Sequence, residues 1–308
     1  MSKPWKQILG GWLTLSRPPF HTVGILPFIL GTVLAWKFTA SFNPSVFILG
    51  ISAVILIMLS SYLAGEYFDF REDEISHRLY RSHFAGGSGA IQQGILPRRA
   101  ALRASIVSIF LAACIGLILQ FYFQTGKFTL LLGFLGAFPG FFYSTKPIRL
   151  VDRGFGEIFI AFCYGWLPVA SAYYIQTATI HPVINWLAVP IGLTIFNVIL
   201  LNEFPDYEAD KTAGKRNLLN RAGKITGLVI YVILSLLASL AMFASVSFGV
   251  PLVAVYFYLP FFIISLFIIL MMLRHKYEQR KFLEILCGLN IAVNLGTSLS
   301  YLMAYIVK

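Results

Sequence analysis

Charged residues are scarce in this sequence. Asp, Glu, Lys and Arg make up 12% of its 308 residues, about half of the roughly 25% found in soluble domains. Hydrophobic residues make up 58%, and they recur in runs of about 18 or more, the length that crosses a hydrocarbon core about 30 Å thick. The composition excludes an ordinary soluble domain and predicts a bundle of membrane-spanning helices.

Cysteine is scarce as well. Cys114, Cys163 and Cys287 lie singly in apolar stretches, and no CxxC pair occurs. This spacing suggests neither a disulfide framework nor a zinc site. We expect all three side chains to pack inside the bundle.

A continuous basic face is also missing, although the formal net charge is +11. The Lys and Arg residues lie in short loops between apolar runs, whereas a nucleic-acid-binding protein gathers them on one surface. Anionic lipid headgroups and the positive-inside rule explain the excess. We therefore expect the lipid bilayer, and no nucleic acid, as a partner.

The fold that we expect is an all-α, polytopic bundle of nine transmembrane helices in one domain over residues 1–308. The expected spans cover about 20–37, 45–67, 101–122, 127–143, 155–174, 183–203, 225–247, 251–273 and 283–306.

The segment before the first span mixes Lys3 and Lys6 with Trp5, Leu9 and Leu13. No small-residue cleavage site follows a short apolar core, as it would in a secretory signal. We expect this segment at the membrane interface, and the first span to act as its own insertion signal.

The loop charges give the orientation. With the N-terminus inside, all but three of the 24 Lys and Arg residues fall on the cytoplasmic side; the exceptions are Lys37, Lys127 and Lys308. The positive-inside rule therefore predicts a protein of the cytoplasmic membrane with its N-terminus inside and its C-terminus outside. All 13 acidic residues fall on the same cytoplasmic face, which that rule does not require. We expect a functional site there.

Two nine-residue segments share one acidic pattern: residues 65–73, GEYFDFRED, and residues 202–210, NEFPDYEAD. The matched acids are Glu66 and Glu203, Asp69 and Asp206, and Asp73 and Asp210. Positions i, i+3 and i+7 fall within about 60° on a helix, so each motif presents three carboxylates on one face if its helix continues. Pro205 removes a helical N–H from the second motif and is expected to kink or end that helix.

Six carboxylates at one end of a bundle repel one another at low dielectric and need cations. Ligands that are all oxygen favour Mg²⁺, which in proteins takes a few carboxylates together with substrate phosphates and water. Basic residues follow both motifs, in loops that run to residues 100 and 224, and others lie in the loop 144–154. These are Arg71, Arg78 and Arg81; Lys211, Lys215 and Arg216; and Lys146 and Arg149. Carboxylates that hold a metal, surrounded by Lys and Arg, are the pattern expected for a diphosphate.

Nine spans and these motifs resemble the UbiA superfamily of membrane aromatic prenyltransferases. The acidic motifs look like that family's N(D)xxDxxxD and DxxxD motifs, and the likeness extends over nearly the whole chain. It includes Arg17-Pro18 before the first span, YSTKPIR at 143–149, and Gly156-Glu157 at the start of the fifth span.

Within the superfamily, two loops are most similar to the branch that prenylates 1,4-dihydroxy-2-naphthoate for menaquinone. They are GGSGAIQQG at 86–94 and DYEADKTAGKRNL at 206–218. Two positions depart from the pattern: Gly65 stands where Asn is usual in the first motif, and Asn217 where Thr is usual.

The resemblance implies transfer of a polyprenyl group from its diphosphate to an aromatic acceptor, with Mg²⁺ as cofactor. The implied metal ligands are Glu66, Asp69, Asp73, Asn202, Glu203, Asp206 and Asp210. The implied diphosphate-binding residues are Arg17, Arg78, Lys146, Arg149, Lys211 and Lys215. The resemblance also implies five catalytic residues, Asp69, Asp73, Asp206, Asp210 and Tyr143. The π face of Tyr143 would stabilise an allylic cation.

Other functions stay open from the sequence. The acceptor can be 4-hydroxybenzoate, a lipid-ether precursor or a chlorophyll-type ring, and a terpene-cyclising relative needs no acceptor. An ion-coupled transporter is disfavoured because its ligands would lie near the membrane midplane, whereas these acids lie at helix ends.

Overall fold

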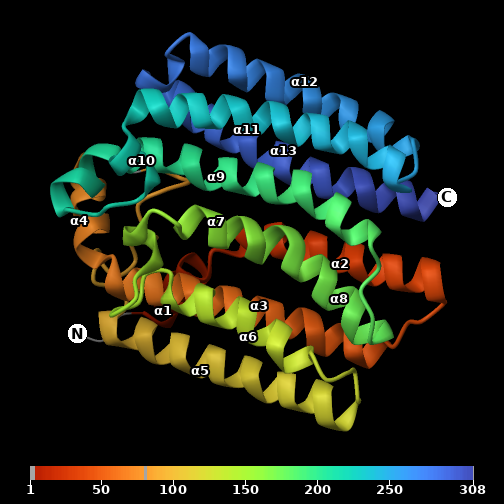
Figure 1. Ribbon diagram of the computed structural model, residues 1–308. Coiled ribbons are helices and arrows are strands. Elements are labelled where there is room, and N and C mark those ends of the chain that lie inside the picture. The colour runs from red at the N-terminus through yellow and green to blue at the C-terminus, as the bar shows by residue number, and fades with distance from the viewer. Residues whose placement is uncertain (1–3, 80–81, 308) are drawn as a thin grey trace.

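The computed structural model describes residues 4–79 and 82–307, and within these ranges every regular element is a helix (Figure 1). The expected all-α membrane bundle is confirmed. Eight helical segments are long and apolar enough to cross a membrane. They are α2 (Pro18–Thr39), α3 (Pro44–Phe68), α5 with η1 (Arg98–Tyr122), α7 to α8 (Gly156–Thr177), α9 (Val183–Ala213), α11 with η4 (Lys224–Phe248), α12 (Val253–Leu273) and α13 (Arg280–Val307).

The ninth expected span is shorter than predicted. α6 (Thr129–Phe142) has 14 residues, which at 1.5 Å per residue measure about 21 Å, less than the roughly 30 Å of a hydrocarbon core. Three glycines, Gly133, Gly136 and Gly140, lie along this helix at helical spacing. The described part of the chain therefore has eight helices of spanning length and one short apolar helix between them.

The two acidic motifs fold in the opposite way to the expectation. The first motif, which has no proline, bends at Asp69, where α3 ends and α4 (Phe70–Leu79) begins. The second motif stays within α9, which continues past Pro205 to Ala213. Pro205 cannot donate to the carbonyl of Leu201, and the Sγ of Cys287 lies 3.8 Å from that oxygen instead. The lost helical bond is thus partly replaced, and the expected span 183–203 extends ten residues further.

Polar side chains join the helices that support the second motif. Asn197 of α9 donates to the carbonyl of Tyr231 on α11 at 3.0 Å, and Asn290 of α13 donates to the carbonyl of Asn197 at 2.9 Å. The Tyr231 hydroxyl donates to Asn290 at 3.0 Å. Such bonds between helices hold membrane bundles together where lipid supplies no hydrophobic force between them. They fix α9, and with it the second motif, relative to α11 and α13.

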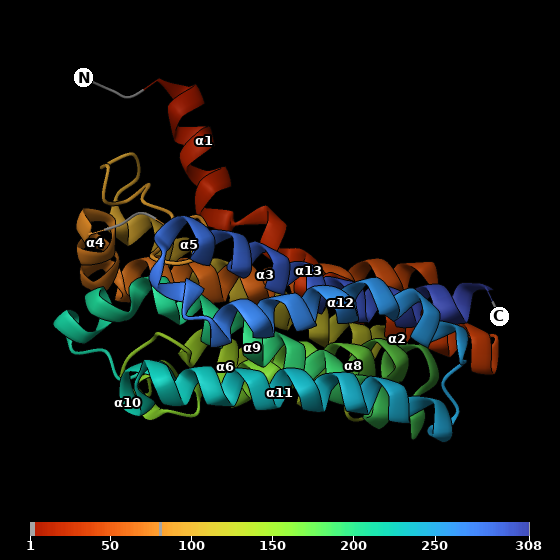
Figure 2. The same cartoon turned by 90° about the horizontal axis from the view of Figure 1, so that it is seen from above.

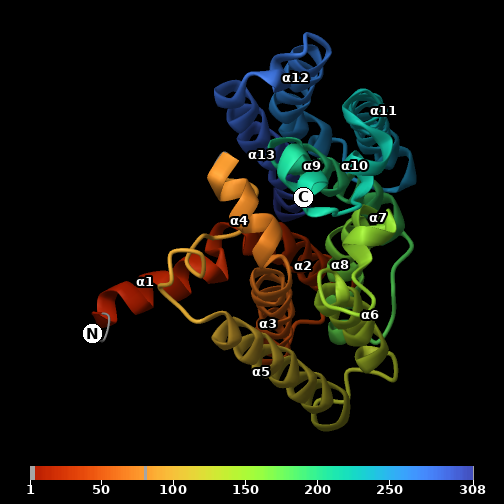
Figure 3. The ribbon, with the colours of Figure 1, turned by 90° about the vertical axis from the view of Figure 1, so that its left-hand side faces the viewer.

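Both motifs and the loops that follow them lie at one end of the bundle. α4 and the short helix α10 (Leu218–Ala222) are at this end, and the last turn of α13 is at the other. Figure 3 looks onto the α4 end. The helix α1 (Trp5–Ser16) projects there from the bundle and runs across the spans (Figure 2).

Candidate active site

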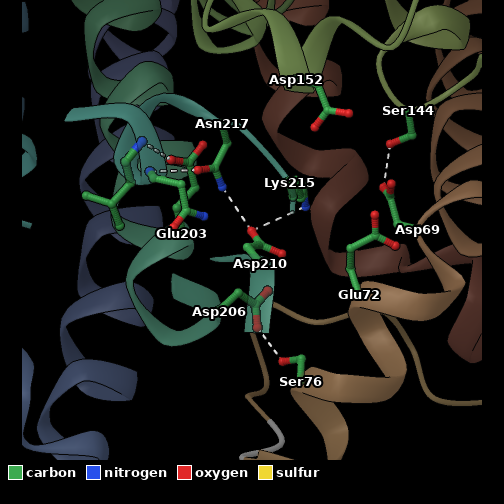
Figure 4. Close-up of polar contacts among 12 residues, drawn as sticks. Asp69, Glu72, Ser76, Ser144, Asp152, Glu203, Asp206, Asp210, Lys215 and Asn217 are labelled. Carbon is green, nitrogen blue, oxygen red and sulfur yellow. Dashed lines mark hydrogen bonds and ion pairs between the residues drawn. The ribbon is translucent and has the colours of Figure 1, made fainter. Parts of the chain in front are cut away.

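The two acidic motifs meet across the gap between α4 and α9 (Figure 4). Ser76 of α4 donates a short hydrogen bond to Asp206 of α9. Gly86, in the loop after the first motif, lies so close that a Cβ there would be 3.1 Å from the Asp206 carboxylate. The expectation that both motifs converge at one end of the bundle is therefore met.

On the side of the first motif, Asp69 lies against the loop that follows α6. Ser144 donates to its Oδ2 at 2.6 Å, and Nη2 of Arg149 lies 2.9 Å from its Oδ1. Arg149 also pairs with Glu72 at 2.7 Å and with Asp152. The buried guanidinium thus ties the bend between α3 and α4 to the loop 144–154.

On the side of the second motif, Asp210 accepts from Asn217 at 2.9 Å and lies 3.4 Å from Nζ of Lys215. Burial by itself lowers the pKa of Lys215, but the nearby carboxylates of Asp210 and Asp69 outweigh burial and raise the pKa well above its usual value. Lys215 is therefore a charged ammonium between the two motifs, with a side chain that is 15% exposed.

A glycine-rich loop, residues 86–94, covers the carboxylates. Gly87 has φ +65°, and a Cβ there would be 2.2 Å from Oδ2 of Asp73. Gly86 has φ +76°. Glycine is required at both positions because the backbone is left-handed and no side chain fits against the acids. The loop backbone forms one wall of the site.

The leading glutamate of each motif holds the loop that follows it. Glu66 is 1% exposed and accepts from the backbone N–H of Ser88 at 2.7 Å, from the Ser88 hydroxyl at 2.9 Å, and from Arg17 at 3.1 Å. Glu203 accepts from the N–H of Leu219 at 3.0 Å. Both are predicted metal ligands. Both oxygens of Glu66 are turned to loop donors, whereas Oε1 of Glu203 is buried and has no hydrogen-bond partner among the described residues.

An apolar cavity of about 430 Å³ lies within the bundle between α2, α3, α5, α6 and α8. Tyr143, at the end of α6, lines it, and so do Gly133, Gly136 and Gly140. These glycines leave room that longer side chains on the short helix would fill. The site thus combines a polar end with an apolar interior.

Asn202, one turn before Asp206 on α9, has a buried side-chain oxygen with no hydrogen-bond partner. Three of the cations expected at the site have exposed side chains. Lys146 and Lys211 are exposed, and the side chain of Arg78 is 75% exposed and paired with Glu74. Of the other loop cations, Arg71 and Arg216 are exposed, and Arg81 lies outside the described residues.

The donors at the site suit a hard divalent cation such as Mg²⁺, which prefers oxygen ligands. Burial, with Glu66 and Asp69 nearby, raises the pKa of Asp73 well above its usual range, so this group gains from added positive charge. Among the described residues, no three His, Cys, Asp or Glu side chains point at one position. The aspartates are each turned toward a hydroxyl, an amide, a glycine or a cation of the chain. The donor chemistry and the unpaired Asn202 oxygen nevertheless fit a divalent metal.

Sequence reasoning missed several side chains that contact the aspartates or hold the loops. They are Glu72, Ser76, Ser88, Ser144, Asp152, Glu157 and Asn217. Some signals were present: Ser76 lies one helical turn after Asp73, and Ser144 stands in the YSTKPIR segment. The hydroxyl roles could not be read from the sequence, since they depend on which helix lies opposite.

The fold and the site define a multi-pass membrane enzyme with a cluster of charged side chains at one end of its helices and an apolar cavity within the bundle. Residues 25–290 match the UbiA prenyltransferase family. The chain belongs to this family and is a prenyltransferase.

Relatives of known function are similar over most of the chain. A 1,4-dihydroxy-2-naphthoate octaprenyltransferase of Bacillus subtilis is 27% identical, over 70% of this chain and 67% of that protein. A 2-carboxy-1,4-naphthoquinone phytyltransferase of Synechocystis is 25% identical, over 70% and 67%.

Solved structures show the same fold. A UbiA homologue from Aeropyrum pernix K1 aligns with a TM-score of 0.68 at 15% identity, over 93% of this chain and 97% of that chain. A UbiA homologue from Archaeoglobus fulgidus, solved bound to GPP and Mg²⁺, aligns with a TM-score of 0.62 at 17% identity, over 95% and 99%.

Proposed function

We propose that this protein transfers a polyprenyl group from its diphosphate to 1,4-dihydroxy-2-naphthoate, with Mg²⁺, in menaquinone biosynthesis. One observation carries the proposal: Asp69, Asp73, Asp206 and Asp210 converge with Lys215 beside Tyr143, which lines an apolar cavity. A lipid with a diphosphate headgroup needs both the charged cluster, for the headgroup, and the apolar cavity, for the tail. The relatives that act on naphthalene rings support the acceptor, and the homologue bound to GPP and Mg²⁺ supports the donor and the metal.

The four aspartates would hold the metal, with Asn202 and Glu203, each of which has a buried oxygen without a partner. We place Glu66 outside this set because both of its oxygens hold the loop. When bound, Mg²⁺ neutralises charge on the diphosphate and so makes it a better leaving group. Lys215 and Arg149, both beside Asp69, would attract the diphosphate oxygens.

In the reaction, the allylic C–O bond breaks, and its electron pair leaves with the diphosphate. An electron-rich ring carbon then forms a bond to the allylic carbon, and the ring loses a proton or its carboxylate as CO₂. Tyr143 would offer its π face to the positive charge. The apolar cavity would exclude water, which would otherwise capture the cation.

We further propose that the protein lies in the cytoplasmic membrane with its N-terminus inside and the site facing the cytoplasm. The loop charges described above support this orientation. Lys308, which would lie outside, is beyond the described residues.

The test is product formation by the purified protein. It would be incubated with Mg²⁺, one long-chain prenyl diphosphate and a panel of acceptors, and products would be read by mass spectrometry, with excess EDTA as control. We expect a prenylated naphthalene product only with Mg²⁺. Product from 4-hydroxybenzoate or a lipid-ether precursor alone would overturn the acceptor, and no release of diphosphate with any acceptor would overturn the function.

A further inference from the structure

α1 differs from every other long helix of the described chain in its direction. It projects away from the bundle, crosswise to the spans, near the end where α4 lies (Figures 2 and 3). Its last residue is followed by Arg17, with φ +46°, and the chain then continues at Pro18 into the first span. If the spans cross the bilayer, α1 lies along the membrane plane.

One face of α1 is docked on the protein. A Cβ on Gly11 would be 2.7 Å from Ile95 and 3.3 Å from Leu96. Leu15 is fully buried in a cluster that also contains Leu63 and Leu96. α1 therefore packs on the segment that completes the glycine-rich loop.

A second face is apolar and has no protein neighbour among the described residues that covers it. Trp5, Leu9 and Leu13 are 69%, 51% and 57% exposed, and at 100° per residue they fall within one third of the helix circumference. The remaining face carries Lys6 and Gln7, both exposed. A helix with Trp and Leu on one face and polar residues on another is typical of the membrane interface, where its apolar side enters about 5–10 Å.

We propose that α1 lies in the headgroup region of the bilayer with Trp5, Leu9 and Leu13 in lipid, and that this position of α1 keeps the glycine-rich loop over the site. The bilayer is the occupant that the structure favours because α1 continues directly into a membrane span. The exposed apolar face is thereby an extension of the lipid-facing surface of the bundle.

The link to the site passes through two contacts. Gly11 and Leu15 hold the segment 95–96, as described. Arg17, at the end of α1, donates to Glu66, and Glu66 holds Ser88 within the loop. This second half of the proposal rests on the proposed function, since it gives α1 an effect on prenyl transfer.

The lipid contact is tested with nitroxide labels in vesicles of phosphatidylcholine and phosphatidylglycerol. Leu9→Cys places a label on the apolar face, and Gln7→Cys, two residues away, places one on the polar face. The labelled wild-type chain gives the background from its own cysteines. We expect the label at 9 to be relaxed by O₂, which dissolves in lipid, and the label at 7 by a water-soluble nickel chelate. A label at 9 that is equally open to the chelate, or shielded from both reagents by a protein contact, would overturn the proposal.

The loop contact is tested with a matched pair of glycines. Gly11→Leu forces a side chain into Ile95, whereas Gly10→Leu meets nothing within 4 Å, and both changes alter helix propensity alike. We expect about tenfold faster amide exchange in residues 86–96 for the Gly11 variant, as overpacking a close contact would produce, and no change for the Gly10 variant. Equal exchange in the two variants would overturn the docking.

A prenyl-transfer assay distinguishes a failure of the proposal about α1 from a failure of the proposed function. In the same vesicles, we expect Leu9→Ser with Leu13→Ser to lower prenyl transfer by at least about tenfold, because the loss of even one Leu weakens lipid docking by about that factor. Gln7→Ser serves as the control and should leave it unchanged. Normal transfer in the double variant would overturn the role in loop positioning. A wild-type protein without transfer would instead refute the proposed function, while the label and exchange results would still decide where α1 lies.

Discussion

Replacing Glu66 with Gln separates two roles that this acidic side chain can have, metal ligand and loop anchor. The carboxylate accepts three hydrogen bonds, two from Ser88 and one from Arg17. A glutamine keeps one acceptor oxygen for the Ser88 N–H and can donate its amide to the Ser88 hydroxyl. What it loses is the negative charge that strengthens all three bonds.

The magnitude follows from the kind of bond. Each hydrogen bond to a charged group contributes about 1.5–3 kcal/mol to stability, and each neutral one about 0.5–1.5 kcal/mol. Replacing the carboxylate with an amide therefore weakens the three bonds by about 3 kcal/mol in total. The Arg17 side chain is 28% exposed. Solvent screening therefore makes the stability lost with the Arg17 bond smaller. The closed conformation of the loop is then destabilised by about 2 kcal/mol in all, which raises the population with an open loop roughly 30-fold.

The assay combines two readouts, amide exchange of residues 86–94 and the Mg²⁺ concentration that gives half-maximal transfer. For Glu66→Gln we expect exchange about 30-fold faster, in line with that cost, and an unchanged Mg²⁺ requirement. Asp69→Asn is the comparison and should raise the Mg²⁺ requirement. If Glu66→Gln raised the Mg²⁺ requirement as Asp69→Asn does and left loop exchange unaltered, the anchor role would be refuted.

Three further changes test the site. Asp206→Ala should abolish transfer while the protein stays folded in detergent, and near-normal turnover would exclude Asp206 from the metal-binding set. Lys215→Met should raise the KM for the prenyl diphosphate at least about tenfold, since a buried charge-assisted contact is lost, and an unchanged KM would remove Lys215 from the diphosphate site. Gly87→Ala should reduce kcat because its Cβ meets Asp73. Gly249→Ala, also at a positive φ but with nothing within 4 Å, should cost only stability. Equal kcat in the two variants would contradict a loop packed on the acids.

Much of the fold was readable because membrane spans have a strong sequence signal. Runs of apolar residues must satisfy their backbone hydrogen bonds internally and therefore form helices. The course of the two motifs was not readable, because it depends on local contacts. Pro205 does not end α9, where Cys287 lies against the freed carbonyl, and Asp69 closes α3 without a proline.

The sequence indicated the acidic residues of the candidate site more clearly than its basic residues. The repeated spacing of Asp69, Asp73, Asp206 and Asp210 indicated a shared site whichever way each helix ended. Basic residues in loops carry no such periodicity, so Arg78 could not be distinguished from Lys215 by sequence. Burial distinguishes them in the structure: Arg78 extends to solvent, and Lys215 lies between the motifs.

The central claim is that both acidic motifs together hold a metal and a diphosphate. The most direct measurement is Mn²⁺ binding in the presence of inorganic diphosphate, followed by the electron paramagnetic resonance signal of free Mn²⁺ and competed with Mg²⁺. The account predicts binding by the wild-type protein and its loss in both Asp69→Ala and Asp206→Ala. Full binding in either variant would contradict it, since one motif would then suffice.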